Sequence, residues 1–534
     1  MRLPVRTPRT QSSQSNSRWL DYSVWTVGLW ASLLNLLNFN QYPLFRPEVG
    51  LALLGLALVG ALMGMMQQVA RPRLAFLVAG LFAATMIDLN TSIGLSWFYA
   101  VWAGLALVGF FALDALLKIV LAASIAVLVF QFAGSVTGIG APARNENLAE
   151  NRQDAGRAVS GRPAIVHLVL DSYLGLDGMA LGPDEYRDLR AEQAAFFTDR
   201  GFQLYPRAYS RHAKTLNSLP HLFSYGGTWP EIRTVSQQYA VPEELPYFAD
   251  LDRRGYRTSA VLPDYFDLCV RQELTHCRKF ESSALTSMLG TELGTSDRAK
   301  VFGFTLLSLG GLTARLALAI QLGANDLLGR EERLPFNRSE LFPLASIGEL
   351  DRFTEALAGR PPREGGRAHL LLPHDPYMLN ADCTVKPEAK WLDEHGPASE
   401  AARERGYADQ VRCLQRRLGK MLDVLDRTTA GREAIVVIHG DHGSRISPAV
   451  PYLGGPELTE REMLMAHSTF FAMRVPGEPA GEVAGAVALD ELMADFHARD
   501  FASAPRPAPA PARVMIMDTD WVPREWRALP EFAP

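Results

Sequence analysis

This chain of 534 residues lacks an excess of basic residues, has few cysteines, and has no histidine or cysteine in its first part. Basic residues are not in excess, since 53 Lys and Arg stand against 58 Asp and Glu; the net charge of −5 gives no reason to expect nucleic acid as a partner. Only four cysteines occur, and none has the C-x-x-C spacing of many zinc sites. The region before residue 137 has neither cysteine nor histidine, yet it holds most of the long apolar runs. The chain therefore has two parts of different composition.

The first part is typical of a membrane protein. Spanning a bilayer takes about 20 mainly apolar residues. Five stretches approach this length, and the third is the shortest: 22–39, 49–66, 74–88, 96–113 and 117–136. We therefore expect an α-helical anchor of about five spans over residues 1–137. The first apolar run lacks the small-residue pattern of a cleavable signal, so we expect it to span the membrane.

The basic residues orient this anchor, because Lys and Arg gather on the cytoplasmic side of a membrane. Several arginines precede the first span, Arg71 and Arg73 lie between the second and third, and Lys118 lies between the fourth and fifth. Arg46 is the one basic residue on the other side. We therefore expect the N-terminus in the cytoplasm and everything after residue 137 outside it.

Few polar residues lie inside the expected spans, which argues against a transporter or a proton pump. Asp88 and Asp114 lie at span ends, where we expect water to reach them. Asn35 and Asn38 lie in the first span, and we expect them to hydrogen-bond across helices. The first part is therefore predicted to be an anchor.

All four cysteines lie in the part expected outside the cytoplasm, where disulfides persist. Four cysteines allow three connectivities. We predict local pairing, Cys269 with Cys277 and Cys383 with Cys413. A zinc site built from the four cysteines is the alternative.

The second part has the pattern of an α/β domain. It follows a polar segment, 138–162, that is predicted to be a linker. Five short β-rich runs are predicted to be buried strands: 164–170, 257–262, 368–372, 434–438 and 468–475. Helical patterns alternate with them: 184–200, 245–254, 344–358, 400–427 and 485–498. Such alternation favours a mostly parallel central sheet covered by helices, here over residues 163–503.

Two further segments need an assignment. The stretch 301–329 is apolar but contains Arg315, and a membrane crossing there would separate two halves of the sheet. We expect it to be a helix on the domain or at the bilayer surface. Residues 504–534 are predicted to be a proline-rich connector and a C-terminal tail.

Polar residues follow three of the predicted strands. Asp171 follows the first, His374 follows "LLLP", and Asp441-His442 follow "AIVVI" and two further residues. In open α/β sheets, sites form at the carboxyl ends of strands. Thr215 is expected at or near a helix start, which stabilises negative charge. Carboxylates with one imidazole suit a divalent ion, so we expect one zinc, manganese or magnesium ion.

These motifs resemble the alkaline-phosphatase and sulfatase superfamily, especially its membrane-anchored phosphoglycerol and phosphoethanolamine transferases. "GDHGSR" after an apolar strand is the most specific motif, and "PHDPY" and "AKTLNS" accompany it. The resemblance covers about residues 163–480 by motif and the anchor by layout. It implies a five-span anchor in a bacterial inner membrane and an extracytoplasmic sulfatase-like domain.

The resemblance also implies roles for single residues. Two aspartates and a histidine would bind the metal ion: Asp171, Asp441 and His442. Thr215 would be the metal-bound nucleophile, and His374 would contact the phosphate or the leaving group. Three further residues are candidates for substrate binding, with a solvated charge or a core histidine as the alternative: Lys214, Arg445 and His467.

The chain also departs from parts of that superfamily. Formylglycine sulfatases carry a C/S-x-P/A-x-R pattern at the nucleophile, which "HAKTLNS" lacks. Their paired aspartates after the first strand appear here as Asp171-Ser172, and the D-x-x-x-H pattern of two-metal phosphatases does not occur. We therefore expect a single metal ion, and sulfate-ester hydrolysis is the less favoured interpretation.

The sequence thus predicts an enzyme that moves a phospho-substituent from a membrane lipid to an extracytoplasmic glycan or lipid, through a covalent phospho-threonine. An ester hydrolase of the same fold, a phosphatase or sulfatase with water as acceptor, is the first alternative. A catalytically silent membrane scaffold is the second, although intact ligands argue against it.

Overall fold

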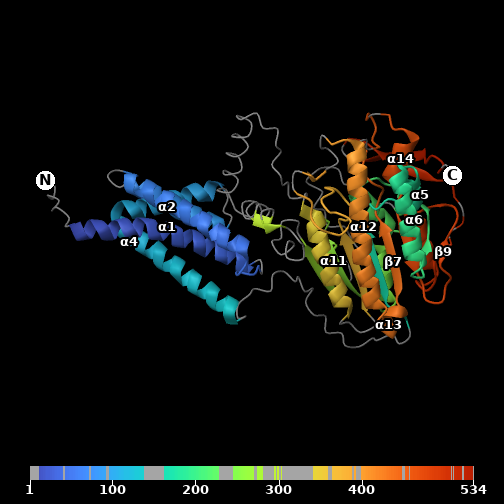
Figure 1. The fold of residues 1–534 in the computed structure, drawn as a ribbon, viewed down its shortest axis with the longest axis horizontal. Helices are drawn as coiled ribbons and strands as arrows, with labels where there is room; N and C mark the ends of the chain where they lie inside the picture. The colour runs from blue at the N-terminus through green and yellow to red at the C-terminus, as the bar shows by residue number, and fades with distance from the viewer. Residues whose placement is uncertain are drawn as a thin grey trace. The chain divides into compact units, whose positions relative to one another are not determined.

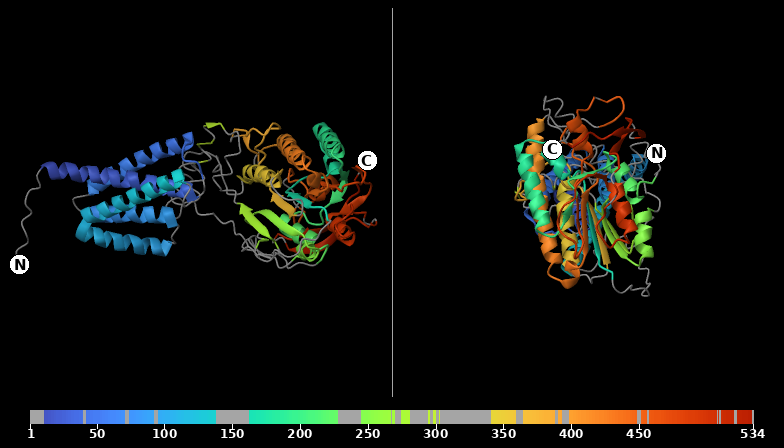
Figure 2. Two further views of the ribbon diagram at one scale, coloured as in Figure 1. Left: turned by 90° about the horizontal axis from the view of Figure 1, so that it is seen from below. Right: turned by 90° about the vertical axis from the view of Figure 1, so that its right-hand side faces the viewer.

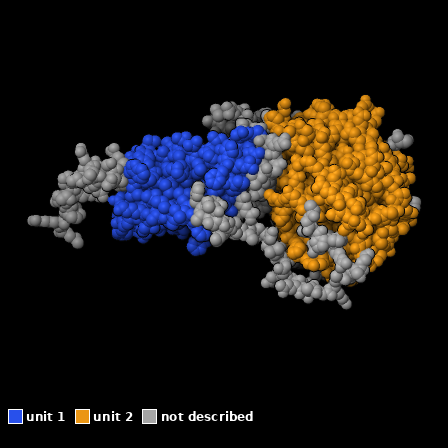
Figure 3. Space-filling model, turned by 60° about the horizontal axis from the view of Figure 1, so that its bottom comes forward, with its two compact units in different colours: residues 1–144, 283–286, 294–336 blue, residues 145–282, 287–293, 337–534 orange. Residues whose placement is uncertain are grey.

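The chain folds into two compact units in a computed structural model. Residues 1–144, 283–286 and 294–336 form the first unit, and the rest forms the second (Figure 3). The structure describes residues 11–39, 42–70, 74–91, 95–137, 162–227, 245–266, 268–269, 274–280, 294–295, 298–299, 302, 341–358, 364–387, 390–392, 398–447, 451–455, 457–506, 508, 510–519 and 522–532. Apart from Arg162 and Phe302, the predicted linker 138–162 and the predicted helix 301–329 lie outside these ranges.

The first unit consists of apolar helices in its described part. They are α1 (Gln11–Phe39), α2 (Pro47–Ala70), α3 (Ala75–Thr91) and α4 (Leu95–Thr137) (Figure 1). Two described stretches are long and apolar enough to cross a membrane, Pro47–Ala70 and Ser96–Gln131, and Ala75–Asp88 is a shorter apolar helix. The predicted fourth and fifth spans both lie in α4, whose backbone leaves helical geometry at Ala112 (φ −148°, ψ 56°). The number of five spans stays a prediction.

Helices α1 and α2 approach each other at two glycines one helical turn apart. A Cβ atom at Gly60 would lie 2.6 Å from the Cα of Thr26, and one at Gly64 would lie 2.9 Å from the Asp21 carbonyl oxygen. Small residues at this spacing let helix backbones pack closely in membranes. The outer face of α2 is apolar, and Leu58 there is 70% exposed. The close helix packing and the apolar surface support the predicted membrane anchor.

Polar residues inside this unit behave in two ways. Asn38 Nδ2 donates to Gln131 Oε1 at 2.7 Å, and Gln131 Nε2 donates to Asn35 Oδ1 at 2.6 Å, so the predicted bonds across helices are confirmed. The expected exposure of Asp88 is wrong, because its side chain is fully buried. Helix α3 continues to Thr91, which places Asp88 inside the helix and not beyond its end.

The second unit is built on an eight-stranded sheet with the order β5-β4-β6-β1-β7-β8-β2-β9. Its strands are β1 (Ile165–Leu170), β2 (Gln203–Leu204), β4 (Arg257–Pro263), β5 (His276–Phe280), β6 (Glu364–Leu370), β7 (Ile435–Gly440), β8 (Phe471–Arg474) and β9 (Gly481–Glu482). Strand β8 runs antiparallel to β7 and β2, and all other pairs in this sheet are parallel. The predicted mostly parallel sheet is therefore confirmed.

The five predicted strands all form, with shifted ends. Strand β6 ends at Leu370, two residues earlier than expected, and β7 continues through His439 to Gly440 because its ladder with β1 extends that far. Every residue of β1 is buried, as expected for a parallel strand with helices on both faces.

Helices cover both faces of this sheet (Figure 2). One layer holds α6 (Asp184–Thr198), α11 (Phe342–Ala358) and α12 (Glu400–Leu425), and the other holds α7 (Thr215–Phe223), α8 (Pro246–Arg253) and α15 (Leu489–Ala498). The helix predicted at 485–498 starts late, because β10 (Ala486–Ala488) first pairs with β3 (Arg207–Tyr209).

Covalent and terminal features complete the second unit. The predicted disulfides Cys269–Cys277 and Cys383–Cys413 both form.

The C-terminal tail was predicted only as a connector and an end segment, but part of it forms a hairpin. Strand β11 (Arg513–Met517) pairs antiparallel with β12 (Pro523–Ala528), and Val514 and Ile516 are buried. These apolar side chains supply the driving force for the hairpin to fold back onto the unit.

Candidate active site

The order of the strands brings the predicted site residues together. Strands β6, β1 and β7 are neighbours and parallel, so their carboxyl ends meet at one edge of the sheet. Leu170 pairs with Leu370 on one side and with Gly440 on the other. The segments that begin at Asp171 and Asp441 therefore leave the sheet side by side.

A buried cluster that could hold a metal ion lies at this edge. One ligand atom each of Asp171, Asp441 and His442 lies within 4.8 Å of the others, and all three side chains are buried. His442 Nε2 lies 3.6 Å from Asp171 Oδ1 and 3.5 Å from Asp441 Oδ2. His442 Nδ1 lies 2.7 Å from the Gly443 carbonyl oxygen and must donate to it, because a carbonyl accepts only. The lone pair on Nε2 therefore faces the two carboxylates.

The Thr215 hydroxyl joins this cluster. Its Oγ1 lies 3.3 Å from Asp171 Oδ2 and 3.4 Å from His442 Nε2. Thr215 is the first residue of α7, after the extended N-cap residue Lys214 (φ −141°, ψ 136°), so the predicted helix start is confirmed. The positive end of the α7 dipole therefore lies beside the hydroxyl.

The charge balance of the cluster fits a divalent cation. Asp441 Oδ1 accepts from the backbone N–H groups of Ser172 (3.0 Å) and His442 (2.9 Å), but its buried Oδ2 has no hydrogen-bond partner among the described residues. Burial, and then the charge of Arg445, lower the pKa of His442 to about 3, so its imidazole is neutral. Two buried carboxylates are costly without a compensating cation. Two carboxylates, an imidazole and a hydroxyl form a suitable donor set.

Ser172 and two glycines shape the backbone around the cluster. Ser172 has a left-handed backbone (φ 63°), which orients its N–H toward Asp441, while its Oγ donates to Asp171 Oδ1 at 3.0 Å. A Cβ at Gly440 would lie 2.3 Å from Thr469 Oγ1, and one at Gly443 would lie 1.9 Å from the Met465 carbonyl oxygen. The glycines of "GDHG" therefore serve close packing.

His374 lies on the loop that follows β6. The α12 side chain of Gln410 holds this loop, since its Nε2 donates to the His374 carbonyl oxygen at 2.7 Å. Burial by itself lowers the pKa of His374, but the carboxylates of Asp375 and Asp171 outweigh it and raise the pKa above its ordinary value of 6.5. His374 makes no described hydrogen bond to the cluster, yet it lies near enough for its charge to act on Asp171 and His442.

The three candidate substrate-binding residues have different positions. Arg445 is half-buried, with Nη2 3.4 Å from His442 Nε2, and Lys214 is half-buried at the N-cap of α7. His467 is fully buried, and its Nδ1 bonds to the Ser210 carbonyl oxygen at 2.9 Å. Burial lowers the pKa of His467 to about 4. The substrate-binding roles of all three stay predictions.

Two residues that the sequence analysis missed also face the cluster. His369 is 1% exposed, its Nε2 lies 4.0 Å from Asp171 Oδ2, and neither ring nitrogen has a hydrogen-bond partner among the described residues. Tyr265, just after β4, donates to Asp171 Oδ2 at 3.4 Å. The signal for His369 was a polar residue inside an apolar strand. The signal for Tyr265 was its position at the carboxyl end of another strand.

Comparison with known proteins identifies neighbours only among solved structures. No protein-family profile and no curated protein matches the chain. A protein in the alkaline phosphatase superfamily from Vibrio parahaemolyticus is similar, with a TM-score of 0.37 and 13% identity over 67% of this chain and 73% of its own. The phosphonate monoester hydrolase of Agrobacterium radiobacter is also similar, with a TM-score of 0.37 and 10% identity over 66% of this chain and 80% of its own.

A third neighbour is the C-terminal periplasmic domain of EcEptC from Escherichia coli. It has a TM-score of 0.38 and 11% identity over 70% of this chain and 94% of its own. Because these TM-scores are low, any function has to be inferred from the chain's own side chains. The Vibrio parahaemolyticus neighbour belongs to the alkaline phosphatase superfamily, the family that the sequence motifs resemble.

Proposed function

We propose that the protein is a membrane-anchored, metal-dependent transferase. It moves phosphoglycerol or phosphoethanolamine from a membrane lipid to an extracytoplasmic glycan or lipid. One observation carries the proposal. The Thr215 hydroxyl, at the N-terminus of a helix, lies 3.3 Å and 3.4 Å from two groups of the buried acidic cluster. A hydroxyl held in this way is suited to attack a phosphodiester.

In the first half-reaction, Thr215 Oγ forms a bond to the phosphorus of the lipid, and the bond from phosphorus to the diacylglycerol oxygen breaks. The hydroxyl proton passes to Asp171 Oδ2, the acceptor 3.3 Å away. The carboxylates of Asp375 and Asp171 raise the pKa of His374, which favours its protonated form, and the imidazolium gives its proton to the leaving oxygen. The N-terminus of α7 stabilises the charge on the phosphoryl oxygens. A divalent ion held by Asp171, Asp441 and His442 would lower the pKa of a hydroxyl and offset this charge.

The second half-reaction reverses these roles. An acceptor hydroxyl attacks the phosphorus of the phospho-threonine, and the bond from phosphorus to Thr215 Oγ breaks. The neutral His374 takes the acceptor's proton, and Asp171 returns a proton to Thr215 Oγ. The protein thus regains its starting state, and the head group now stands on the acceptor. A hydrolase would differ only in using water as the acceptor.

The same proposal places the protein in a bacterial inner membrane with five spans and the second unit outside the cytoplasm. The break at Ala112 supports it, because it divides the long apolar helix α4 where two spans would meet. The two disulfides suit an oxidising compartment. A reporter fused after residue 137 should be active only outside the cytoplasm, and cytoplasmic activity would refute this orientation.

Labelled lipids test the reaction. The purified full chain, supplied with zinc or manganese, is incubated with vesicles of phosphatidylglycerol or phosphatidylethanolamine labelled in the head group. We expect mass spectrometry to find the labelled group on Thr215. A Thr258→Ala variant, which loses a buried threonine on β4, is the matched control and should still be labelled. Absence of label from both lipids would refute the transferase, and release of the free head group into water without an acceptor would favour the hydrolase.

A further inference from the structure

A chain of buried hydrogen bonds leads from helix α8 to the backbone just before Asp441. The Tyr247 hydroxyl lies 2.7 Å from His167 Nδ1, and His167 Nε2 lies 2.7 Å from His439 Nε2. His439 Nδ1 lies 2.6 Å from the Gly440 carbonyl oxygen. These side chains come from α8, β1 and β7, and each is no more than 1% exposed. We call Tyr247, His167 and His439 the histidine relay.

The geometry gives every bond in the relay a direction. His439 Nδ1 must donate to Gly440, because a carbonyl oxygen only accepts. A neutral His439 then has a lone pair on Nε2, so His167 Nε2 carries the hydrogen of the bond between the two rings. His167 Nδ1 is in turn an acceptor, and the Tyr247 hydroxyl donates to it. Aligned donors of this kind polarise one another, which strengthens the last bond, to Gly440.

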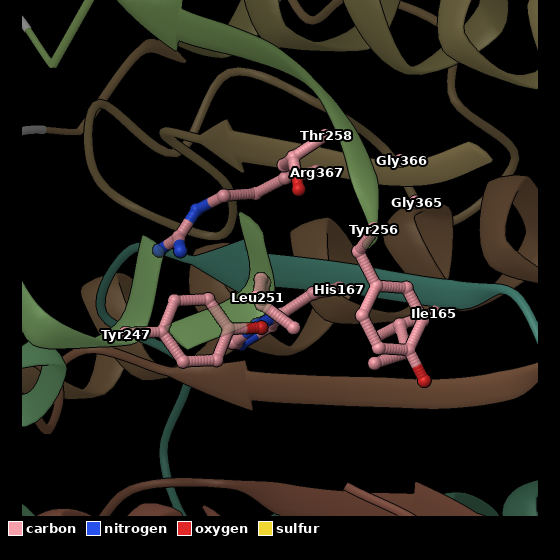
Figure 4. A pocket seen from close by; sticks show the side chains of 9 residues that line it. All are labelled: Ile165, His167, Tyr247, Leu251, Tyr256, Thr258, Gly365, Gly366 and Arg367. Atoms are coloured by element: carbon pink, nitrogen blue, oxygen red, sulfur yellow. The ribbon is translucent and has the colours of Figure 1, made fainter. Parts of the chain in front are cut away.

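The surroundings of the relay favour this neutral arrangement. Arg367 lies beside it, as Figure 4 shows for Arg367, Tyr247 and His167 along one cavity. The guanidinium carbon lies 3.7 Å from the ring centre of Phe223 and 5.6 Å from that of Tyr247. A second buried positive charge next to this cation would be costly. Both rings of the relay are therefore neutral, and each has one N–H and one lone pair.

The relay ends where the ladder between β1 and β7 ends. Just after β1, the N–H of Asp171 donates to the Leu370 carbonyl and that of Ser172 donates to Asp441 Oδ1. Both backbone donors that follow β1 are thus directed elsewhere. The His439 ring supplies a hydrogen bond to the Gly440 carbonyl at this point, and the peptide that it holds leads directly into Asp441.

We propose that Tyr247, His167 and His439 are positioning residues that hold the Gly440–Asp441 peptide and thereby place the Asp441 and His442 side chains for metal binding. This inference rests on the metal site of the proposed function. It assigns a role to buried residues that touch neither the substrate nor the reacting atoms.

Zinc affinity is the first test, measured on the full chain by competition with a chelator. His439→Phe keeps a ring against Phe471, with which His439 stacks, but it removes the bond to Gly440. We expect it to weaken zinc binding about tenfold, the lower end of the range known for outer-shell partners, and Tyr247→Phe, two bonds further away, to weaken it about threefold. Tyr205→Phe is the matched control. Its buried hydroxyl also makes one short bond, 2.6 Å to the Pro505 carbonyl, away from the cluster, and it should leave zinc affinity unchanged.

Hydrogen exchange of the zinc-free protein is the second test and does not depend on metal. We expect the amides of residues 440–446 to exchange faster in His439→Phe than in the wild type. Tyr205→Phe should show no such acceleration, even if it lowers the thermal stability by a similar amount. Local acceleration supports the relay even if the wild-type chain binds no zinc, a result that would refute only the metal site. Unchanged exchange in His439→Phe, or wild-type zinc affinity in that variant, would overturn the relay.

Discussion

Two buried polar clusters lie along the same strands, and they differ in what they leave unsatisfied. At the carboxyl ends of β1 and β7, Asp171 and Asp441 carry like charges, and one carboxylate oxygen has no described partner. A few residues earlier, His167 and His439 match donor to acceptor. Burial is nearly complete in both clusters. The two clusters are therefore distinguished by their charge and by the matching of hydrogen-bond donors to acceptors, and not by burial. The acidic cluster is suited to bind a cation, and the histidine pair is suited to hold the backbone beside it.

Removing the nucleophile should have the largest effect. We expect Thr215→Ala to lower head-group transfer more than about a thousandfold, as loss of a covalent nucleophile does elsewhere. Zinc affinity should change little, because the two carboxylates and the imidazole remain. The measurement is transfer of labelled head group from lipid vesicles beside chelator competition. Thr215→Ser, which keeps a hydroxyl, should keep part of the activity; an active alanine variant would contradict the assignment of Thr215.

Removing one carboxylate should change metal binding next most strongly. We expect Asp441→Asn to weaken zinc affinity by more than about a hundredfold, because loss of a ligand should exceed the effect known for outer-shell partners. Without metal this variant should melt no lower than the wild type, because one of two facing buried carboxylates is gone. Thermal unfolding with and without zinc measures both effects. The exposed Asp382→Asn is the control. If zinc stabilises Asp441→Asn as much as the wild type, Asp441 is not a metal ligand.

The pH dependence of transfer should report His374. Its pKa is raised above 6.5, so the proton needed by the leaving oxygen is present at lower pH and is lost as pH rises through that raised value. We expect the rate to fall about tenfold per pH unit above it, as for a single essential acid. Initial rates from pH 6 to 10 measure this limb. His374→Gln should be slower, and its rate should not fall in this way as the pH rises. If the variant shows the same fall, a group other than His374 is the essential acid.

Removing the charge beside the relay should have the smallest effect. Arg367→Met loses the contacts of the guanidinium with aromatic rings, worth roughly 0.5–2 kcal/mol, but it also removes a buried charge of comparable or greater cost. We expect the free energy of unfolding to change by no more than about 1 kcal/mol, and zinc affinity to stay the same. Denaturant unfolding measures the first quantity. A loss of several kcal/mol would contradict this balance, because the contacts of the guanidinium would then outweigh the cost of its buried charge.

Much of the architecture could be predicted from local patterns. Apolar runs predicted the central strands and the apolar helices, because burial on both faces of a parallel sheet demands continuous hydrophobic residues. The two disulfides, Cys269–Cys277 and Cys383–Cys413, were predicted from the short spacing of their cysteines. The number of membrane spans could not be settled in this way, since α4 joins two predicted spans across Ala112.

By itself, the sequence determined which residues end the strands, and hence that Asp171, Asp441 and His442 would lie at a sheet edge, with Thr215 at a helix start. Only the tertiary structure decided that β6, β1 and β7 are neighbours, because strand order depends on how the helices pack and not on any one segment. The same packing turned His369 toward Asp171 and joined His167 to His439 across 272 residues. It also buried the tail hairpin. Such contacts arise between elements distant in the chain, so no local pattern of residues encodes them.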